Sequence, residues 1–154
     1  MSDAKKIMNV IKEKEIQFVD LRFTDPRGKM QHVSQHVSTI DEQSLTEGFM
    51  FDGSSIAGWK AINESDMKLM PDCSRGIVDP FFSQPTLSIF CDVLEPLSGQ
   101  PYERDPRSTA KQALSYMSSL GIGDTAYFGP EPEFFVFDDV QFQDEMNSSF
   151  YKID

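Results

Sequence analysis

Two hydrophobic periods alternate over the first forty residues of the chain. Apolar side chains recur at helical spacing between residues 7 and 11, which predicts a helix over residues 3–15 with Asp3 as its N-cap. Residues 16–24 instead alternate apolar and polar side chains, as a half-buried strand does. The turn signature at 25–28 then predicts a hairpin, whose returning strand spans residues 29–37.

A short helix and a loop are predicted next. Thr39 followed by Glu42 fits a capping box, and Gly48 can end the helix that the box starts. Glycine and serine then dominate residues 52–58, which is typical of an irregular loop.

Two further strands are predicted at 67–70 and 86–93. The stretch between them, residues 71–80, is rich in turn-forming residues, so we expect the two strands to pair in antiparallel fashion. Helices and strands are therefore mixed without a βαβ repeat, which predicts an α+β fold.

A domain boundary is predicted near residue 103, which divides the chain into residues 1–103 and 104–154. The stretch at 95–101 is rich in helix and strand breakers, and a helix with clear ends follows it. Asp105 is the expected N-cap, Pro106 the first helical residue, and Gly121 the residue past the end.

The second of these domains is predicted to be incomplete. Its helix carries an apolar stripe of Ala110, Ala113, Leu114 and Met117, and strand-like runs follow at 125–128 and 134–137. A helix and two strands over about fifty residues are too few to enclose a core.

Composition narrows the class of protein. The 154 residues carry a net charge of −11 and have a pI near 4.5, so their field repels phosphate backbones and argues against a nucleic-acid partner. Neither a signal peptide nor a membrane span is evident, and we expect a cytoplasmic protein with no membrane partner. Cys73 and Cys91 have no metal-type spacing, and we expect reduced thiols.

Two glutamates stand out in the run FGPEPEFFVFDD at residues 128–139. In an extended segment Glu131 and Glu133 share one face, roughly 6 to 7 Å apart, and the prolines before each of them stiffen the backbone. Like charges held together need solvent, a shared proton or a cation, and oxygen ligands suit Mg²⁺ or Mn²⁺. An exposed edge strand is the simpler interpretation, and a glycosidase acid–base pair is a weaker one.

A second group of candidate residues lies in the glycine- and serine-rich loop. Asp52 begins this loop and Asp66 precedes the next strand, and together these two acids could stabilise a cation or accept a proton. The loop also holds Ser55 and Trp59, the only tryptophan of the chain. As structure alone, this is a surface loop that Trp59 anchors in the core, with Asp66 as a cap.

Three motifs together resemble type I glutamine synthetase, the bacterial ATP-dependent glutamate–ammonia ligase. They are FDGSSIAGWKAINESDMKLMPD at 51–72, YERDPR at 102–107 and FGPEPEFFVFDD at 128–139. Their order is that of the family, and the resemblance covers residues 7–154. It implies a β-grasp-like N-terminal domain followed by the start of the catalytic domain.

The resemblance also implies roles for single residues. Glu133 would bind the metal nearest glutamate and Glu131 the metal nearest the ATP phosphates. Asp52 would bind ammonium and take its proton, with support from Asp66, while Ser55 and Trp59 would shape the loop over the site.

An oligomer is implied as well. In this family the Asp52-type loop serves the neighbouring subunit, and two six-membered rings of subunits stack. Family chains are about three times as long, so we expect these 154 residues alone to be inactive. A stand-alone module that binds synthetase subunits is the alternative from another class.

Overall fold

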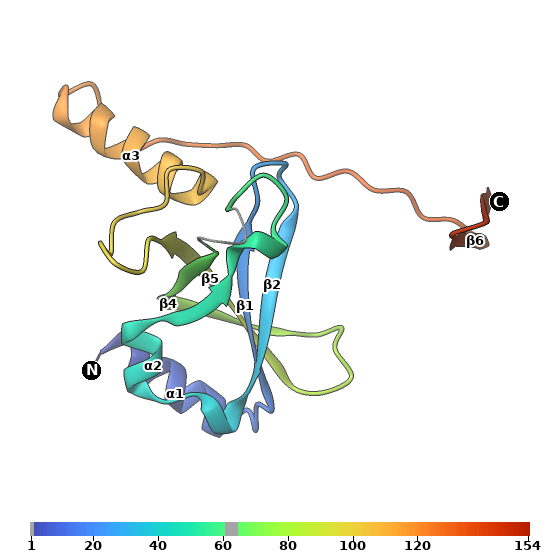
Figure 1. Ribbon diagram of the computed structural model, residues 1–154, viewed down its shortest axis with the longest axis horizontal. Helices are drawn as coiled ribbons and strands as arrows, with labels where there is room; N and C mark the ends of the chain where they lie inside the picture. Colours follow the sequence, from blue (N-terminus) through green and yellow to red (C-terminus); the bar gives the residue numbers. More distant parts are fainter. Residues whose placement is uncertain (1, 61–64) are drawn as a thin grey trace. The chain divides into compact units, whose positions relative to one another are not determined.

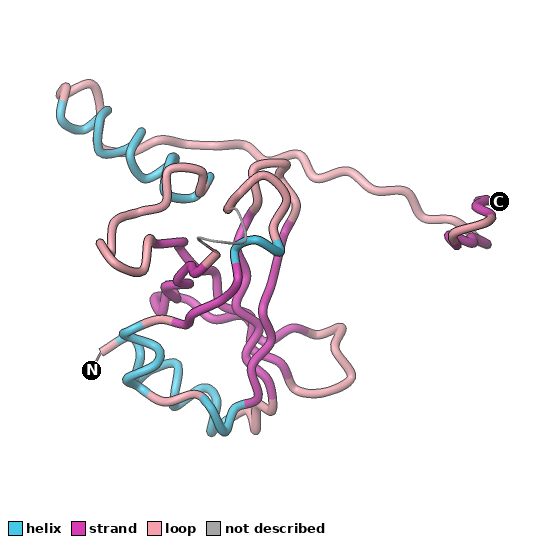
Figure 2. Tube along the Cα trace, viewed as in Figure 1, coloured by secondary structure: helices cyan, strands magenta, loops and turns pink. Residues whose placement is uncertain are grey.

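The structure is a computed structural model that describes residues 2–60 and 65–154. It contains two compact units, residues 1–124 and 125–154, each with its own secondary structure. Figures 1 and 2 show the elements along the chain. The helices are α1 (Asp3–Glu13), η1 (Val37–Thr39), α2 (Glu42–Glu47), η2 (Gly53–Ser55) and α3 (Pro106–Ser119). The strands are β1 (Phe18–Thr24), β2 (Met30–His36), β3 (Phe49–Asp52), β4 (Asp66–Asp79), β5 (Thr86–Leu94), β6 (Val140–Glu145) and β7 (Ser148–Ile153).

A five-stranded mixed sheet organises the first unit. The strands lie in the order β2-β1-β5-β4-β3, with β1 and β5 parallel and every other neighbouring pair antiparallel. Helices α1 and α2 pack on β4 through Ile7, Ile11 and Leu45, all buried. The predicted α+β class, the 16–37 hairpin and the antiparallel pairing of β4 with β5 are confirmed.

The alternation in β1 separates two faces of the sheet. Val19, Leu21 and Phe23 are buried in the hydrophobic core, and full burial of each such side chain contributes about 1.5–3 kcal/mol. The opposite face carries Asp20 and Arg22, as the period-two pattern predicts. Asp20 is also buried, so this face holds a polar network rather than open solvent.

The caps of the first two helices differ from those predicted. Ser2, not Asp3, is the N-cap of α1, and its side chain accepts a hydrogen bond from Lys5 N over 3.2 Å. The capping box of α2 is formed by Asp41 and Ser44.

The predicted box of Thr39 and Glu42 was wrong because η1 occupies Val37–Thr39 and shifts the start of α2. Gly48 ends α2, as predicted, with a φ of 88° that favours glycine.

Between residues 49 and 80 one strand is longer than predicted and another was not predicted. Residues 71–79 are not a turn, because β4 continues through them to Asp79. The pairing of β4 with β5 changes register between Pro71 and Gly76, and such an irregularity lets a strand accept a proline. Strand β3 was not predicted, since its four residues are too short for a periodic signal.

The ends of α3 agree with the prediction, and most of its apolar stripe is exposed. Asp105 is the N-cap, Pro106 opens the helix, and Gly121 follows it with a φ of 65°. Ala110, Ala113 and Leu114 are exposed, with Leu114 at 43%. Among the described residues of the first unit none buries these three side chains, whereas Met117 is partly buried.

The second unit is a two-stranded hairpin preceded by an irregular segment. Residues 125–128 and 134–137 form no strand, contrary to the prediction, and the strands are β6 and β7 instead. Phe134, Phe135 and Val136 are more than four-fifths exposed. A lone hairpin is marginal in water, which agrees with the expectation that this part cannot enclose a core. No helix in the described parts of the chain has the length and apolar character needed to cross a bilayer.

Candidate functional site

Asp52 and Asp66 lie opposite each other at one end of the edge strand β3. They are direct partners in the antiparallel register of β3 and β4, and both are exposed. Directly opposite residues of an antiparallel pair point to the same face, so two carboxylates are held side by side. Like charges in that position are destabilising, and a bound cation would relieve the repulsion.

The carboxylate of Asp52 is oriented by its neighbours. Its Oδ1 accepts hydrogen bonds from Ser54 N over 2.9 Å and from Ser54 Oγ over 2.7 Å. These bonds from Ser54, with a weaker one from Ser65, lower the pKa of Asp52 below its usual value. The side chain is therefore anionic at neutral pH and suited to attract a cation.

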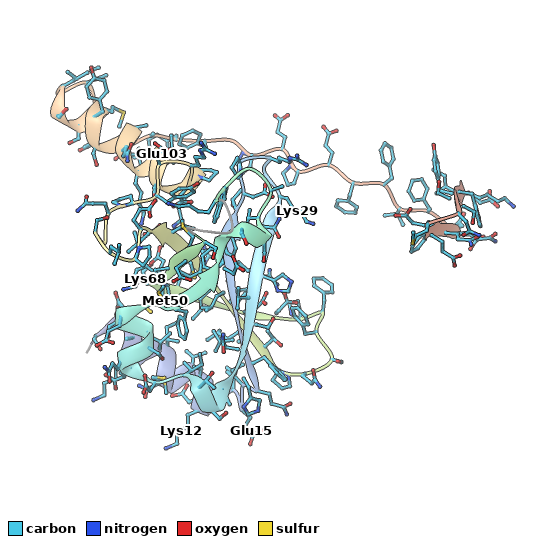
Figure 3. The ribbon with its side chains drawn as sticks, in the orientation of Figure 1. Lys12, Glu15, Lys29, Met50, Lys68 and Glu103 are labelled. Atoms are coloured by element: carbon cyan, nitrogen blue, oxygen red, sulfur yellow. The ribbon has the colours of Figure 1, made fainter. Side chains whose placement is uncertain are left out.

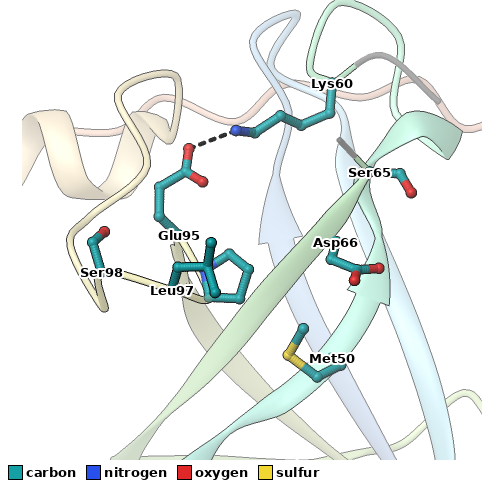
Figure 4. A pocket seen from close by; sticks show the side chains of 8 residues that line it. Met50, Lys60, Ser65, Asp66, Glu95, Leu97 and Ser98 are labelled. Atoms are coloured by element: carbon teal, nitrogen blue, oxygen red, sulfur yellow. Dashed lines mark hydrogen bonds and ion pairs between the residues drawn. The ribbon is translucent and has the colours of Figure 1, made fainter. Parts of the chain in front are cut away.

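A surface pocket of about 770 Å³ lies beside Asp66. Figure 4 shows Asp66, Ser65 and Met50 on one side of it, and Glu95, Leu97 and Ser98 on the other. Lys60 Nζ reaches across to Glu95 Oε1 over 2.7 Å.

Ser55 and Trp59 occupy very different positions in the loop. Ser55 is exposed, whereas Trp59 is only 6% exposed and packs in a cluster of aromatic rings. Its ring centroid lies 5.4 Å from that of Phe23, 6.1 Å from Phe51 and 5.3 Å from Tyr102. Trp59 therefore anchors the loop in the core, which was the structural interpretation of this residue.

Glu131 and Glu133 lie in the second unit, in a segment that forms neither helix nor strand, and both are exposed. Among the described residues no group of three or more His, Cys, Asp or Glu side chains could hold a metal ion. The assignment of Glu131 and Glu133 as metal ligands stays a prediction.

Four residues that hold or orient the loop were not predicted: Ser54 and Lys60 within it, and Glu95 and Arg104 beyond it. A signal existed only for Ser54, because Asp followed two residues later by Ser is the spacing of an Asx turn. The other contacts join residues 35 and 46 positions apart, which no local pattern reveals. Residues 61–64, inside the motif at 51–72, lie outside the described residues.

Comparison with known proteins agrees with the motifs. The sequence model described as "Glutamine synthetase, beta-Grasp domain" matches residues 15–96, more than half of the chain. The chain belongs to the glutamine synthetase family. The model of this family's catalytic domain matches residues 103–154. The resemblance, and with it a β-grasp domain followed by the start of a catalytic domain, is thereby confirmed.

Individual relatives show how much of a family member the chain represents. It is 64% identical over all 154 residues to the glutamine synthetase of Azospirillum brasilense, and covers 33% of that protein. It is 63% identical over 150 residues to the glutamine synthetase of Methylococcus capsulatus, and covers 32% of that one. The chain thus spans about one third of these relatives.

The fold has a counterpart among solved structures. A cryo-EM structure of Plasmodium falciparum glutamine synthetase matches 99% of this chain with a TM-score of 0.74 at 24% identity. That match covers 30% of the larger chain and supports the fold alone.

Proposed function

We propose that the chain is the N-terminal third of an ATP-dependent glutamate–ammonia ligase. Such an enzyme transfers a phosphoryl group from ATP to the side chain of glutamate, and ammonia then displaces phosphate from the γ-glutamyl phosphate to give glutamine. The observation that carries the proposal is the pair of facing carboxylates, Asp52 and Asp66, in a chain of this family.

Asp52 is proposed to bind ammonium. Its carboxylate is exposed, and its lowered pKa keeps it charged at neutral pH. An ammonium ion donates hydrogen bonds only, and the facing carboxylate of Asp66 offers further acceptors. A lowered pKa favours holding the cation over retaining its proton, so a proton taken by Asp52 would pass on to solvent.

Glu131 and Glu133 are proposed as ligands for Mg²⁺ or Mn²⁺. Carboxylate oxygens are the donors these cations prefer, but two are too few for a firm site, so other ligands must complete it. A metal bound there would neutralise charge on the phosphoryl group in transfer. Glu133 would face the glutamate side and Glu131 the ATP side.

The active form is proposed to be a cytoplasmic oligomer of two stacked six-membered rings. In it the loop with Asp52, Ser55 and Trp59 serves a neighbouring subunit, while the two glutamates serve their own. The exposed apolar side chains of α3 and of the second unit support burial against more protein. The gap between the family matches, residues 97–102, supports a boundary near residue 103.

Assaying the protein expressed from its own gene tests this function. With glutamate, ammonium, ATP and Mg²⁺ it should form glutamine, whereas the 154-residue chain alone should not. Absence of glutamine formation by the gene product would overturn the proposal. A gene product of about 17.5 kDa that binds an intact synthetase without activity would favour the interaction module.

A further inference from the structure

We propose that Lys60, Glu95 and Arg104 are positioning residues that hold the Asp52 loop, defined as residues 52–60, against the 95–104 segment that leads into α3. The inference rests on the proposed function, because it assigns the loop a task in ammonium binding. Its structural part can be tested without any activity.

Among the described residues, few main-chain hydrogen bonds hold this loop. Two short turns lie within it, each closed by a main-chain hydrogen bond over 3.1 Å: Ile56 N to Gly53 O and Trp59 N to Ile56 O. A third bond, Gly53 N to Ser65 O over 2.7 Å, ties its start to the residue before β4. Side-chain contacts therefore help to set the position of this loop.

Three contacts join the loop to the 95–104 segment. Lys60 Nζ pairs with Glu95 Oε1 over 2.7 Å, and the two side chains are only 19% and 34% exposed. Lys60 Nζ also lies 5.3 Å from the centroid of the Tyr102 ring, within range of a cation–π interaction. The Trp59 and Tyr102 rings meet edge to face.

Arg104 provides the contact at the tip of the loop. Its Nη1 donates to the carbonyl oxygen of Gly58 over 2.6 Å. Gly58 has a φ of 83°, a conformation that glycine adopts without strain. The carbonyl group of this same residue accepts the hydrogen bond from the guanidinium group of Arg104. A hydrogen bond from a charged donor is stronger than a neutral one.

The 95–104 segment is a firm support. Tyr102 N donates to Val93 O over 2.8 Å, which ties the end of the segment to β5. Glu95 N donates to Gln100 O over 2.9 Å, which closes the turn at its start. Leu94 and Pro101 form an isolated bridge beside them. The loop is therefore held against a fixed part of the first unit, and through it Asp52 and Ser54 keep their geometry.

Charge reversal gives a direct test. In the 154-residue chain, Trp59 is the only tryptophan, so its fluorescence reports on the loop. Lys60→Glu and Glu95→Lys should each increase acrylamide quenching of Trp59. The double variant, which re-forms the ion pair with its charges exchanged, should return the quenching to the level of the unmodified chain. Lys12→Glu, an exposed reversal far from the loop on α1, should change nothing (Figure 3).

The same variants in the gene product test the task of the loop. Loss of one charged contact should raise the KM for ammonium about tenfold with kcat little changed, and the double reversal should recover it. Arg104→Gln should raise the KM for ammonium, whereas Arg104→Lys, which keeps a charged donor, should leave that KM close to the value of the unmodified protein. Unchanged quenching in both single reversals, or a double variant no better than either, would overturn the inference. An inactive wild-type gene product with the expected quenching pattern would instead refute the proposed function alone.

Discussion

The carboxylate of Asp105 accepts a hydrogen bond from the backbone nitrogen of Val93 over 3.2 Å. The same side chain caps α3 by accepting bonds from Arg107 N and Ser108 N. One fully buried side chain therefore joins the first turn of the helix to the end of β5.

Removing that carboxylate should destabilise the first unit. Asp105→Ala removes a cap and leaves the buried Val93 N without its acceptor, so the free energy of unfolding should fall by about 2–4 kcal/mol. Gln112→Ala, an exposed change on the same helix, should stay within about 0.5 kcal/mol. Urea unfolding followed by circular dichroism measures both, and equal effects would contradict the role of Asp105.

Replacing the two facing acids should affect different properties: the Asp66 change should raise stability, and the Asp52 change should lower activity. Asp66→Asn removes like-charge repulsion across β3 and β4, so stability at low salt should rise by about 0.2–1 kcal/mol. Asp52→Asn should lower kcat/KM for ammonium by about 10²-fold in the gene product. A gain in stability that persists at high salt would show that repulsion was not its cause.

Asp20 should make stability depend on acid pH. Burial raises its pKa, but hydrogen bonds from Arg22, His32 and Ser34 outweigh burial and lower the pKa below 3.8. A lowered folded-state pKa gives stability that is present above about pH 4 and is lost as the pH falls through the folded value.

The matched variant isolates this contribution. Asp20→Asn should cost about 1–3 kcal/mol at pH 7 and flatten the acid decline. Glu13→Gln, an exposed change on α1, should leave the pH profile as it is. Unfolding free energies between pH 3 and 7 measure both, and a parallel acid decline in Asp20→Asn would contradict the assignment.

Two glycines with a positive φ differ in their surroundings, and Gly48 also has a ψ of 178°, a region of backbone conformation that essentially only glycine occupies. Gly28 and Gly48 have φ values of 83° and 88°, but a Cβ at Gly28 meets open space, whereas one at Gly48 would lie 2.7 Å from Leu69 O. Gly28→Ala should therefore cost about 1–2 kcal/mol and Gly48→Ala clearly more. Thermal unfolding compares the two variants, and equal costs would mean that the backbone at residue 48 relaxes away from both the strain and the contact with Leu69 O.

Metal binding by the 154-residue chain should be weak. Glu131 and Glu133 are two carboxylates where a hard cation needs several ligands, so the dissociation constant for Mn²⁺ should be about millimolar. Glu131→Gln with Glu133→Gln should abolish this binding. Isothermal calorimetry at neutral pH measures it, and tight one-to-one binding by the unmodified chain would contradict the ligand assignment.

Local patterns predicted the elements whose signals are local. The period of β1, the turn at 25–28 and the ends of α3 depend on neighbouring residues, and all three are as predicted. The caps of α1 and α2 moved because several nearby residues could serve and one-residue offsets decide among them.

Long-range pairing explains the errors. Residues 71–79 read as a turn, yet pairing with β5 makes them strand, and the register change accommodates Pro71. Asp52 and Asp66 were predicted to act together, but their direct pairing across β3 and β4 is visible only in the sheet. Trp59 and Tyr102 meet across more than forty residues, which no window of sequence reveals.

The parallel pairing of β1 with β5 has a consequence for synthesis on the ribosome. These strands form the middle of the sheet, and their paired residues, such as Leu21 and Ile89, are far apart in sequence. Loop closure of that length is slow, and the nascent hairpin of β1 and β2 must wait with one edge unpaired until β5 leaves the exit tunnel. Until residue 94 has emerged, β1 therefore has an unpaired edge of the kind that promotes aggregation.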